Sequence, residues 1–176
     1  MVEQDPRDGD RSNLQYDNEF WRFSLAVYEP VEVADECLAL QDSLGLDVNL
    51  LLFCAWLGTR AIILSRSEIE SASRIVGPWH DSVVCALRSV RRQIKTRYGG
   101  EFENFRTHIK SMELEAEQIE QAMRFAHAQG IQSSRVSNRR DAIAGNVNEY
   151  IAMMSRPARS EPAAPFLIRA AQRLAQ

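Results

Sequence analysis

Glycine, proline and cysteine are scarce in this sequence. Its 176 residues include eight glycines and six prolines, and the prolines stand at the borders of apolar segments, so a fold of many short strands and tight turns is disfavoured. The three cysteines, Cys37, Cys54 and Cys85, form no CxxC pair and are odd in number, which argues against a disulfide framework. We therefore expect helices, with small buried thiols in a reducing cytoplasm.

The sequence also lacks a long hydrophobic run. The longest, at 50–57, has eight apolar residues before Gly58, Thr59 and Arg60 interrupt it, whereas a membrane span needs about 20. The N-terminal stretch 1–16 is acidic and has no apolar segment, unlike a signal peptide or a transit peptide. We expect a disordered tail at 1–16, no contact with a membrane and a cytoplasmic location.

Motifs that carry chemistry are missing as well. A P-loop, a dinucleotide-binding fingerprint, HExxH and G-x-S-x-G are all absent. His80, His108 and His127 stand on predicted helices without carboxylate or cysteine partners at metal-ligand spacing, and the Glu-x-x-His pairs of a di-iron bundle are absent too. We expect no metal, no cofactor and no catalytic residue, which favours a protein that is not an enzyme without excluding one.

What the sequence does have is helical periodicity. Apolar residues recur three and four positions apart at about 17–28, 31–44, 47–57, 67–76, 78–98, 101–129, 143–154 and 166–174. We expect an all-α fold, in which a single domain at 17–154 is a bundle of six or seven helices around a central hydrophobic helix. The Pro/Ala-rich stretch 155–165 is expected to link it to a short amphipathic helix at 166–176, which docks either on its own domain or on a partner.

Several segment ends fit helix caps. Asp17 and Asp47 precede the first and third segments and can accept hydrogen bonds from free N–H groups. Ser67 begins the capping-box pattern at 67–70, and Gly45 can take the left-handed conformation that ends a helix. These signals predict where the helices begin and end.

The two longest segments, 78–98 and 101–129, are joined by a short turn and predict a long antiparallel hairpin. In the second of them, apolar residues alternate three and four positions apart, as in a coiled-coil seam. They are Phe102, Phe105, Ile109, Met112, Ala116, Ile119, Met123 and Ala126. The seam is long enough to organise the domain or to accept another chain.

Five stretches together resemble a known family. They are 20–25 (FWRFSL), 37–41 (CLALQ), 45–54 (GLDVNLLLFC), the region of Trp56 and Trp79, and 87–92 (LRSVRR). Over about 17–125, the pattern is similar to a family of short bacterial proteins filed as domain of unknown function 2390. The resemblance implies no activity, ligand or catalytic residue, because none is established for that family.

The start of the hydrophobic helix is a candidate ligand pocket. Its residues are Asp47, Asn49, Trp56 and Arg60 on this helix and Trp21 on the first. An amide beside an acid at a helix N-terminus can hydrogen-bond a small polar ligand. Capping by Asp47 and a satisfied core amide at Asn49 explain both more simply, and we favour that interpretation.

The sequence Trp79-His80-Asp81 offers a possible acid–base pair. Adjacent residues on an α-helix point about 100° apart and rarely bond one another. We therefore favour a core tryptophan followed by two surface neighbours.

A basic face, Arg88, Arg91, Arg92 and Lys95, lies at three-and-four spacing on the first helix of the predicted hairpin. Antiparallel pairing places Glu113 near Arg88, and no acid opposite the other three. Acids of the segment 31–44 can supply further partners, so we favour a solvated or internally paired face over one that binds an anionic partner.

The charge distribution agrees with internal pairing. Residues 1–76 carry 14 acidic and six basic side chains, whereas 131–176 carry three and seven. We interpret the protein as a non-enzymatic helical adaptor or scaffold that engages a protein partner through the basic face or the C-terminal segment. The alternatives are an enzyme or small-ligand protein with a pocket near Asp47 and Asn49 and, less favoured, RNA or ribosome contact; oligomerisation stays open.

Overall fold

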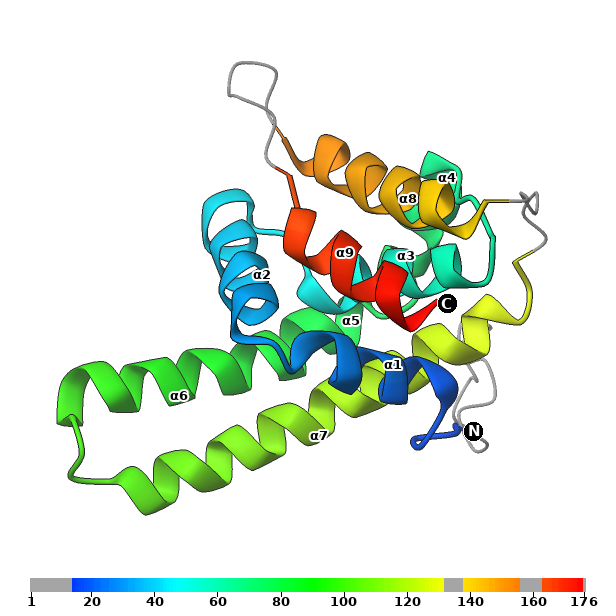
Figure 1. Cartoon of the computed structure of the whole chain (residues 1–176). Helices are drawn as coiled ribbons and strands as arrows, with labels where there is room; N and C mark the ends of the chain where they lie inside the picture. Colours follow the sequence, from blue (N-terminus) through cyan, green and yellow to red (C-terminus); the bar gives the residue numbers. More distant parts are fainter. Residues whose placement is uncertain (1–13, 132–137, 156–162, 176) are drawn as a thin grey trace, which may run out of the picture.

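The computed structural model describes residues 14–131, 138–155 and 163–175, which form an all-α fold without strands (Figure 1). The helices are α1 (Glu19–Tyr28), α2 (Val31–Leu44), α3 (Val48–Thr59), α4 (Arg66–Arg74), α5 (Gly77–Trp79), the π-helical turn η2 (His80–Val84), α6 (Cys85–Tyr98), α7 (Glu103–Ala128), α8 (Arg139–Met154) and α9 (Pro165–Leu174). The predicted all-α class, central hydrophobic helix and antiparallel hairpin are confirmed.

Helix α3 is the centre of the core. Every residue from Asn49 to Gly58 is buried, as expected for a helix that is apolar on all sides. Its most extensive neighbour is α8, and α1, α7 and α9 cover the remaining faces. A Cβ atom on Gly58 would lie 2.5 Å from the Cα atom of Ile143, so the α3 and α8 backbones touch at this glycine.

Aromatic side chains fix α1 and α7 against α3. The ring of Phe20 in α1 lies 5.5 Å from that of Phe53 and 5.3 Å from that of Trp56. On the other side, Trp56 lies 5.7 Å from Phe125 of α7. These spacings are in the favourable range for aromatic pairs, and they place Trp56 in the core.

The helix starts agree only in part with the predicted caps. Asp47 caps α3 as predicted, since its side chain accepts from the backbone N–H groups of the second and third residues that follow it. The prediction of Asp17 for α1 was wrong by one residue, because Asn18 is the cap and Asp17 instead pairs with Arg22. The predicted capping box was shifted by two residues, since Ser65 and not Ser67 is its serine.

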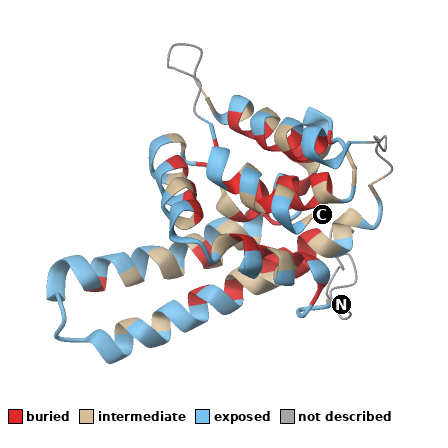
Figure 2. Cartoon of the chain, viewed as in Figure 1, coloured by how far each residue is buried: buried red, intermediate tan, exposed pale blue. Residues whose placement is uncertain are grey.

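Helices α6 and α7 run side by side and project from the body of the molecule (Figure 1). The turn between them contains Gly99 at φ +57°, a conformation that side chains other than glycine's rarely adopt. Figure 2 shows that burial is concentrated in the body and that the far half of the hairpin is largely exposed. The hairpin therefore has a packed base and a free arm.

Helix α9 docks on the chain's own domain. It packs on α1, α2, α3 and α8 and buries Leu167 and Ala171. Its free N–H groups at Phe166 and Leu167 donate to the carboxylate of Glu36 on α2. The predicted tail at 1–16 and linker at 155–165 lie mostly outside the described residues. None of the described helices combines the length and apolar character needed to cross a membrane.

Candidate functional site

A charged cluster is buried where α3, η2 and α7 meet. Arg124 of α7 is fully buried, and its guanidinium donates to the carboxylates of Asp47 and Glu120. Its Nε also donates to the carbonyl of Ala72 at 3.4 Å. Because a buried guanidinium is costly unless paired, the two carboxylates explain how the core contains it.

His80 completes this cluster, which we call the ionic centre (Asp47, His80, Glu120 and Arg124). Its Nδ1 lies 3.0 Å from Oε2 of Glu120 and 3.7 Å from Oδ2 of Asp47. The hydrogen bond with Glu120 raises the pKa of His80, although burial opposes the shift. Burial raises the pKa of Asp47, but the charges of Arg124 and His80 outweigh it, so the pKa is lowered. Both carboxylates are thus paired with Arg124 and lie beside the imidazole of His80.

The backbone at Asp47 is also fixed. Its N–H donates to the hydroxyl of Tyr150 on α8 at 2.9 Å. Burial raises the pKa of that hydroxyl. One residue therefore caps α3, pairs with α7 and contacts α8.

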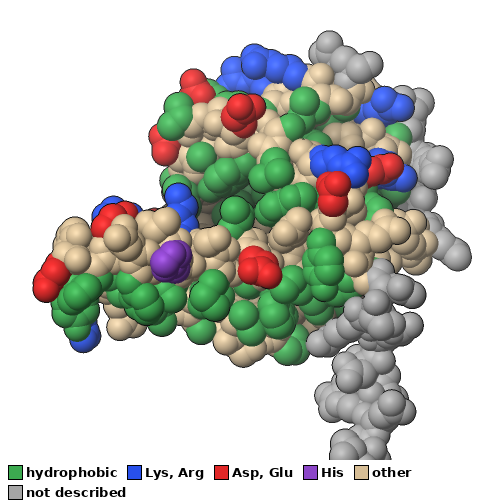
Figure 3. Space-filling view, turned by 90° about the horizontal axis from the view of Figure 1, so that it is seen from below, with side chains coloured by type: hydrophobic (Ala, Val, Ile, Leu, Met, Phe, Trp, Pro, Cys, Tyr) green, Lys and Arg blue, Asp and Glu red, His purple; other side chains and the backbone are tan. Residues whose placement is uncertain are grey.

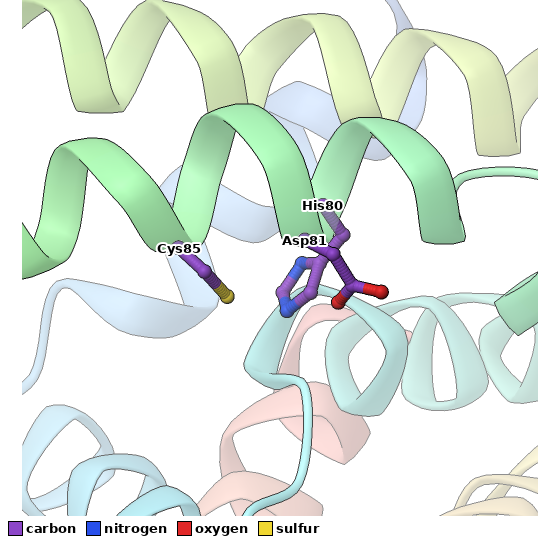
Figure 4. Close-up of side chains that lie close together, drawn as sticks. All are labelled: His80, Asp81 and Cys85. Atoms are coloured by element: carbon purple, nitrogen blue, oxygen red, sulfur yellow. The ribbon is translucent and has the colours of Figure 1, made fainter.

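The π-helical turn positions His80. In η2 the N–H of Cys85 donates to the carbonyl of His80, five residues earlier, so these two residues lie one above the other instead of being offset as in an α-helix. His80, Asp81 and Cys85 then direct their side chains to the same side of the helix (Figure 4). Single π turns are frequent at functional sites.

Two groups of side chains in the described residues have ligand atoms close enough to hold a metal. One is His80, Asp81 and Cys85, and the other is Asp47, His80 and Glu120. Both share His80. The expectation that His80 is a surface residue was wrong, since its side chain is only 17% exposed and is bonded to Glu120 of α7.

A pocket of about 420 Å³ lies beside the ionic centre, between α1, α2, α3, α6 and α7. Its wall includes Trp21, Ser24, Asn49 and Gln121. Gln121 Nε2 donates to Asn49 Oδ1 at 2.8 Å, but Gln121 Oε1 and Ser24 Oγ are buried without a partner among the described residues. Unpaired buried polar atoms are uncommon, so this wall has hydrogen-bonding capacity to spare.

Arginines and glutamates close one side of the pocket. Arg88 donates to Glu113 at 3.1 Å and to Glu117 at 2.7 Å, and Arg91 donates to Glu113 as well. Burial raises the pKa of Glu113. The hydrogen bond and charge of Arg91, and then those of Arg88, outweigh burial, so the pKa lies below its ordinary value. The pairing of Arg88 with Glu113 was predicted; the prediction that Arg91 has no acidic partner in the hairpin was wrong.

The remaining predicted site residues lie in different places. Trp21 and Asn49 line the pocket, whereas Asp47 belongs to the ionic centre and Trp56 to the aromatic core. Arg60 pairs with Glu19, and its guanidinium lies 5.2 Å from the centre of the Trp56 ring. The structure therefore brings two of the five candidates together at the pocket.

The basic face is divided in the same way. Arg88, Arg91 and Arg92 line the pocket, and Lys95 lies further along α6 on the exposed arm. Arg92 also reaches Asp42 of α2 at 3.3 Å. The pairing of a basic residue with an acid of 31–44 agrees with the predicted internal pairing.

The arm of the hairpin carries an exposed apolar surface. Phe105 is 56% and Met112 52% exposed, although both belong to the predicted seam. Figure 3 shows hydrophobic side chains following the projecting arm. A pair of helices leaves part of such a seam uncovered, because each seam side chain is buried only where it inserts between residues of a facing helix. We call this surface the open seam: Val90, Tyr98, Phe102, Phe105 and Met112.

Sequence reasoning missed the partners of His80. Glu120 and Arg124 stand four residues apart on a long helix, a spacing typical of an exposed ion pair. The available signal was that Glu120 lies four residues after Ala116 and three before Met123, on the side of the helix that carries the apolar seam.

These features define an all-α protein with a buried ionic centre, an adjacent pocket and a projecting hairpin. The chain belongs to the family described as protein of unknown function (DUF2390), whose model matches residues 19–123. No match was found among curated proteins or solved structures. The matched part contains the hairpin up to Met123, η2 and α3, but not α8 or α9.

Proposed function

We propose that this protein is a non-enzymatic adaptor that binds an acidic amphipathic helix of a partner protein on the open seam of the hairpin. The observation that supports it is the exposure of Phe105 and Met112 at seam positions of a projecting arm. Contiguous apolar surface of this kind is typical of interaction sites, and a helix laid in a groove is anchored at three-and-four spacing.

The charge of the arm specifies the partner. Residues 90–112 contain six basic side chains against two acidic ones. Three of the six are paired with acids of this chain, whereas Lys95, Arg97 and Lys110 form no ion pair with the described residues and remain for a partner. A second copy of the arm would bring like charges together, whereas an acidic helix would complement them. The C-terminal segment is less suited to bind a partner, because α9 is docked on the chain's own domain.

The first test compares two double variants. Phe105→Glu with Met112→Glu places charges on the open seam, whereas Thr107→Glu with Ser111→Glu adds the same charges to exposed positions on the other side of α7. Affinity purification from native cells followed by mass spectrometry should lose the partner with the first variant only. The captured protein should then bind the purified chain directly, through an acidic amphipathic segment.

Three outcomes would overturn the proposal. Equal capture by both variants would place the interface elsewhere. Capture that depends on added RNA would favour nucleic acid, the other class of partner that a basic surface with exposed aromatic rings can take. Concentration-dependent dimerisation abolished by the seam variant would identify a second copy as the occupant.

The pocket supports a second candidate function, the binding of a small amphiphilic anion. The specific observation is the unpaired Ser24 hydroxyl, which can donate to an anion, in a largely apolar wall that also includes Arg92 and Lys110. Its volume of about 420 Å³ lies within the range of ligand pockets.

Dodecanoate is a suitable probe, with dodecyltrimethylammonium as its cationic counterpart. Calorimetry should detect binding of the anion only, weakened about tenfold or more by Arg92→Glu with Lys110→Glu. The matched variant Lys95→Glu with Arg97→Glu changes the same charge outside the pocket and should bind normally. Equal binding of both detergents, or equal loss in both variants, would remove this candidate.

We further propose a cytoplasmic location for this function. All three cysteines have free thiols, and free thiols persist in reducing compartments. A tagged chain with Ser111→Cys, which adds an exposed thiol, should stay unmodified by a membrane-impermeant thiol reagent in intact cells and should be labelled after lysis.

A further inference from the structure

We propose that His80, Asp81 and Cys85 form a zinc-binding site at the π-helical turn. Their ligand atoms, a ring nitrogen, a carboxylate oxygen and a sulfur, lie within 4.8 Å of one another. Two ligands on one tetrahedral zinc ion are about 3.5 Å apart, so small rotations of these side chains close the site. Asp81 is exposed and Cys85 partly exposed, which gives an ion access from solvent.

The backbone of η2 creates the juxtaposition. In an α-helix, positions five apart face different directions, at about 100° per residue. The hydrogen bond from the Cys85 N–H to the His80 carbonyl spans five residues and returns Cys85 to the face of His80. Figure 4 shows the three side chains together on that face. The expectation that no metal binds here rested on α-helical spacing, which this turn does not have.

The surroundings of His80 favour coordination. Nδ1 lies 3.0 Å from Glu120, and donation of its proton to that carboxylate leaves the lone pair of Nε2 for a metal. A carboxylate that orients a histidine through its second nitrogen is the usual arrangement around a zinc ligand. Glu120 is itself fixed by Arg124, so the orientation of the imidazole is determined by a buried partner.

The other group with ligand spacing, Asp47, His80 and Glu120, is a poorer site. Arg124 already donates to both of its carboxylates from a fully buried position. A divalent ion there would lie against this guanidinium and would compete for the same oxygens. The ionic centre therefore serves as the support of the site and not as the site.

The donor set selects the metal. A nitrogen, a sulfur and an oxygen donor are all ligands of zinc, and three protein ligands leave a fourth position for water. Zinc binds the thiolate form of cysteine, so the Cys85 thiol proton goes to solvent as the Zn–S bond forms. Binding should consequently release a proton and become tighter with rising pH.

Zinc alone is the probe, titrated by calorimetry into the full chain freed of metal by chelation. We expect one ion per chain and, in a parallel titration with Co²⁺, the thiolate-to-cobalt absorption. Cys85→Ser should abolish that absorption and, like Asp81→Asn, weaken zinc binding about tenfold or more. The matched control His108→Gln removes an exposed histidine elsewhere on the hairpin and should bind as the wild type does.

The thermal midpoint provides a second readout, because an ion that binds only the folded state raises it. At the same zinc concentration, zinc should raise the midpoint of the wild type and of the control by more than that of Cys85→Ser. The proposal fails if the wild type binds no zinc, if Cys85→Ser binds zinc equally well, or if His108→Gln loses binding to the same extent. Circular dichroism of each variant distinguishes loss of the site from loss of the fold.

Discussion

Arg124 and Asp47 lie 77 positions apart in the sequence, and the guanidinium of the first donates to Oδ2 of the second. Oδ1 of the same carboxylate accepts from the N–H groups of Asn49 and Leu50. The residue that starts the central helix is therefore also the one that fixes the hairpin to it. This ion pair joins the N-terminus of α3 to the buried part of α7.

We expect Arg124→Ala to destabilise the protein by about 3–5 kcal/mol, because it leaves two buried carboxylates without their shared cation. Urea unfolding followed by circular dichroism measures the loss. The control is Arg106→Ala, which breaks the surface pair with Glu103 and should change stability far less. Similar losses in both variants would mean that the ionic centre is open to solvent.

The contribution of Glu113 should depend on pH. The pKa of this carboxyl is lower in the folded state than its unfolded value of about 4.3. Its stabilising effect is therefore present above that value and lost as pH falls through the folded-state pKa. The difference in unfolding free energy between the wild type and Glu113→Gln should be largest near neutral pH and should shrink in acid.

The control for this effect removes its cause. In a background with Arg88→Met and Arg91→Met, the Glu113→Gln difference should show much weaker pH dependence. A difference that grows in acid would contradict the assignment.

Two glycines should respond in opposite ways to alanine. Gly58→Ala puts a methyl group against the backbone of α8 at Ile143 and should cost about 1–3 kcal/mol or more. A Cβ atom on Gly145, within α8, meets nothing within 4 Å, so Gly145→Ala should stabilise by up to about 1 kcal/mol through helix propensity. Thermal unfolding of the two variants measures both effects. A Gly58→Ala variant as stable as the wild type would refute the close approach of α3 and α8.

The cap of α9 can be removed without touching its apolar face. Glu36→Ala deletes the acceptor for two N–H groups of α9 and should cost about 1 kcal/mol. Glu115→Ala, at an exposed position of α7 away from α9, is the matched control and should be nearly neutral. Amide exchange at Phe166 and Leu167 should become faster in the first variant alone.

Local sequence patterns were sufficient for most of the fold. The cap at Asp47 and the stop at Gly45, which has φ +68°, follow from chemistry within a few residues. Small errors at Asn18 and Ser65 arose where two capping residues stand close together and tertiary packing selects one. Apolar periodicity also predicted the hairpin and its first cross-helix pair.

The site could not be predicted in this way because it depends on contacts between distant segments. Asn49 was identified, but its bond to Gln121 spans 72 positions. The neighbours of His80 required a π turn, which shifts the helical phase by one residue and leaves no signature in hydrophobic spacing. Burial of Glu120 and Arg124 also contradicts the usual exposure of charged residues.

The order of synthesis separates α3 from α8, its largest partner. The ribosome completes the most hydrophobic helix and then must make the entire α6–α7 hairpin before α8, its largest partner, can reach it. During that interval one face of α3 has no permanent cover. The nascent chain thus exposes apolar surface that is prone to aggregate, and a fragment limited to the family match at 19–123 should aggregate when expressed alone.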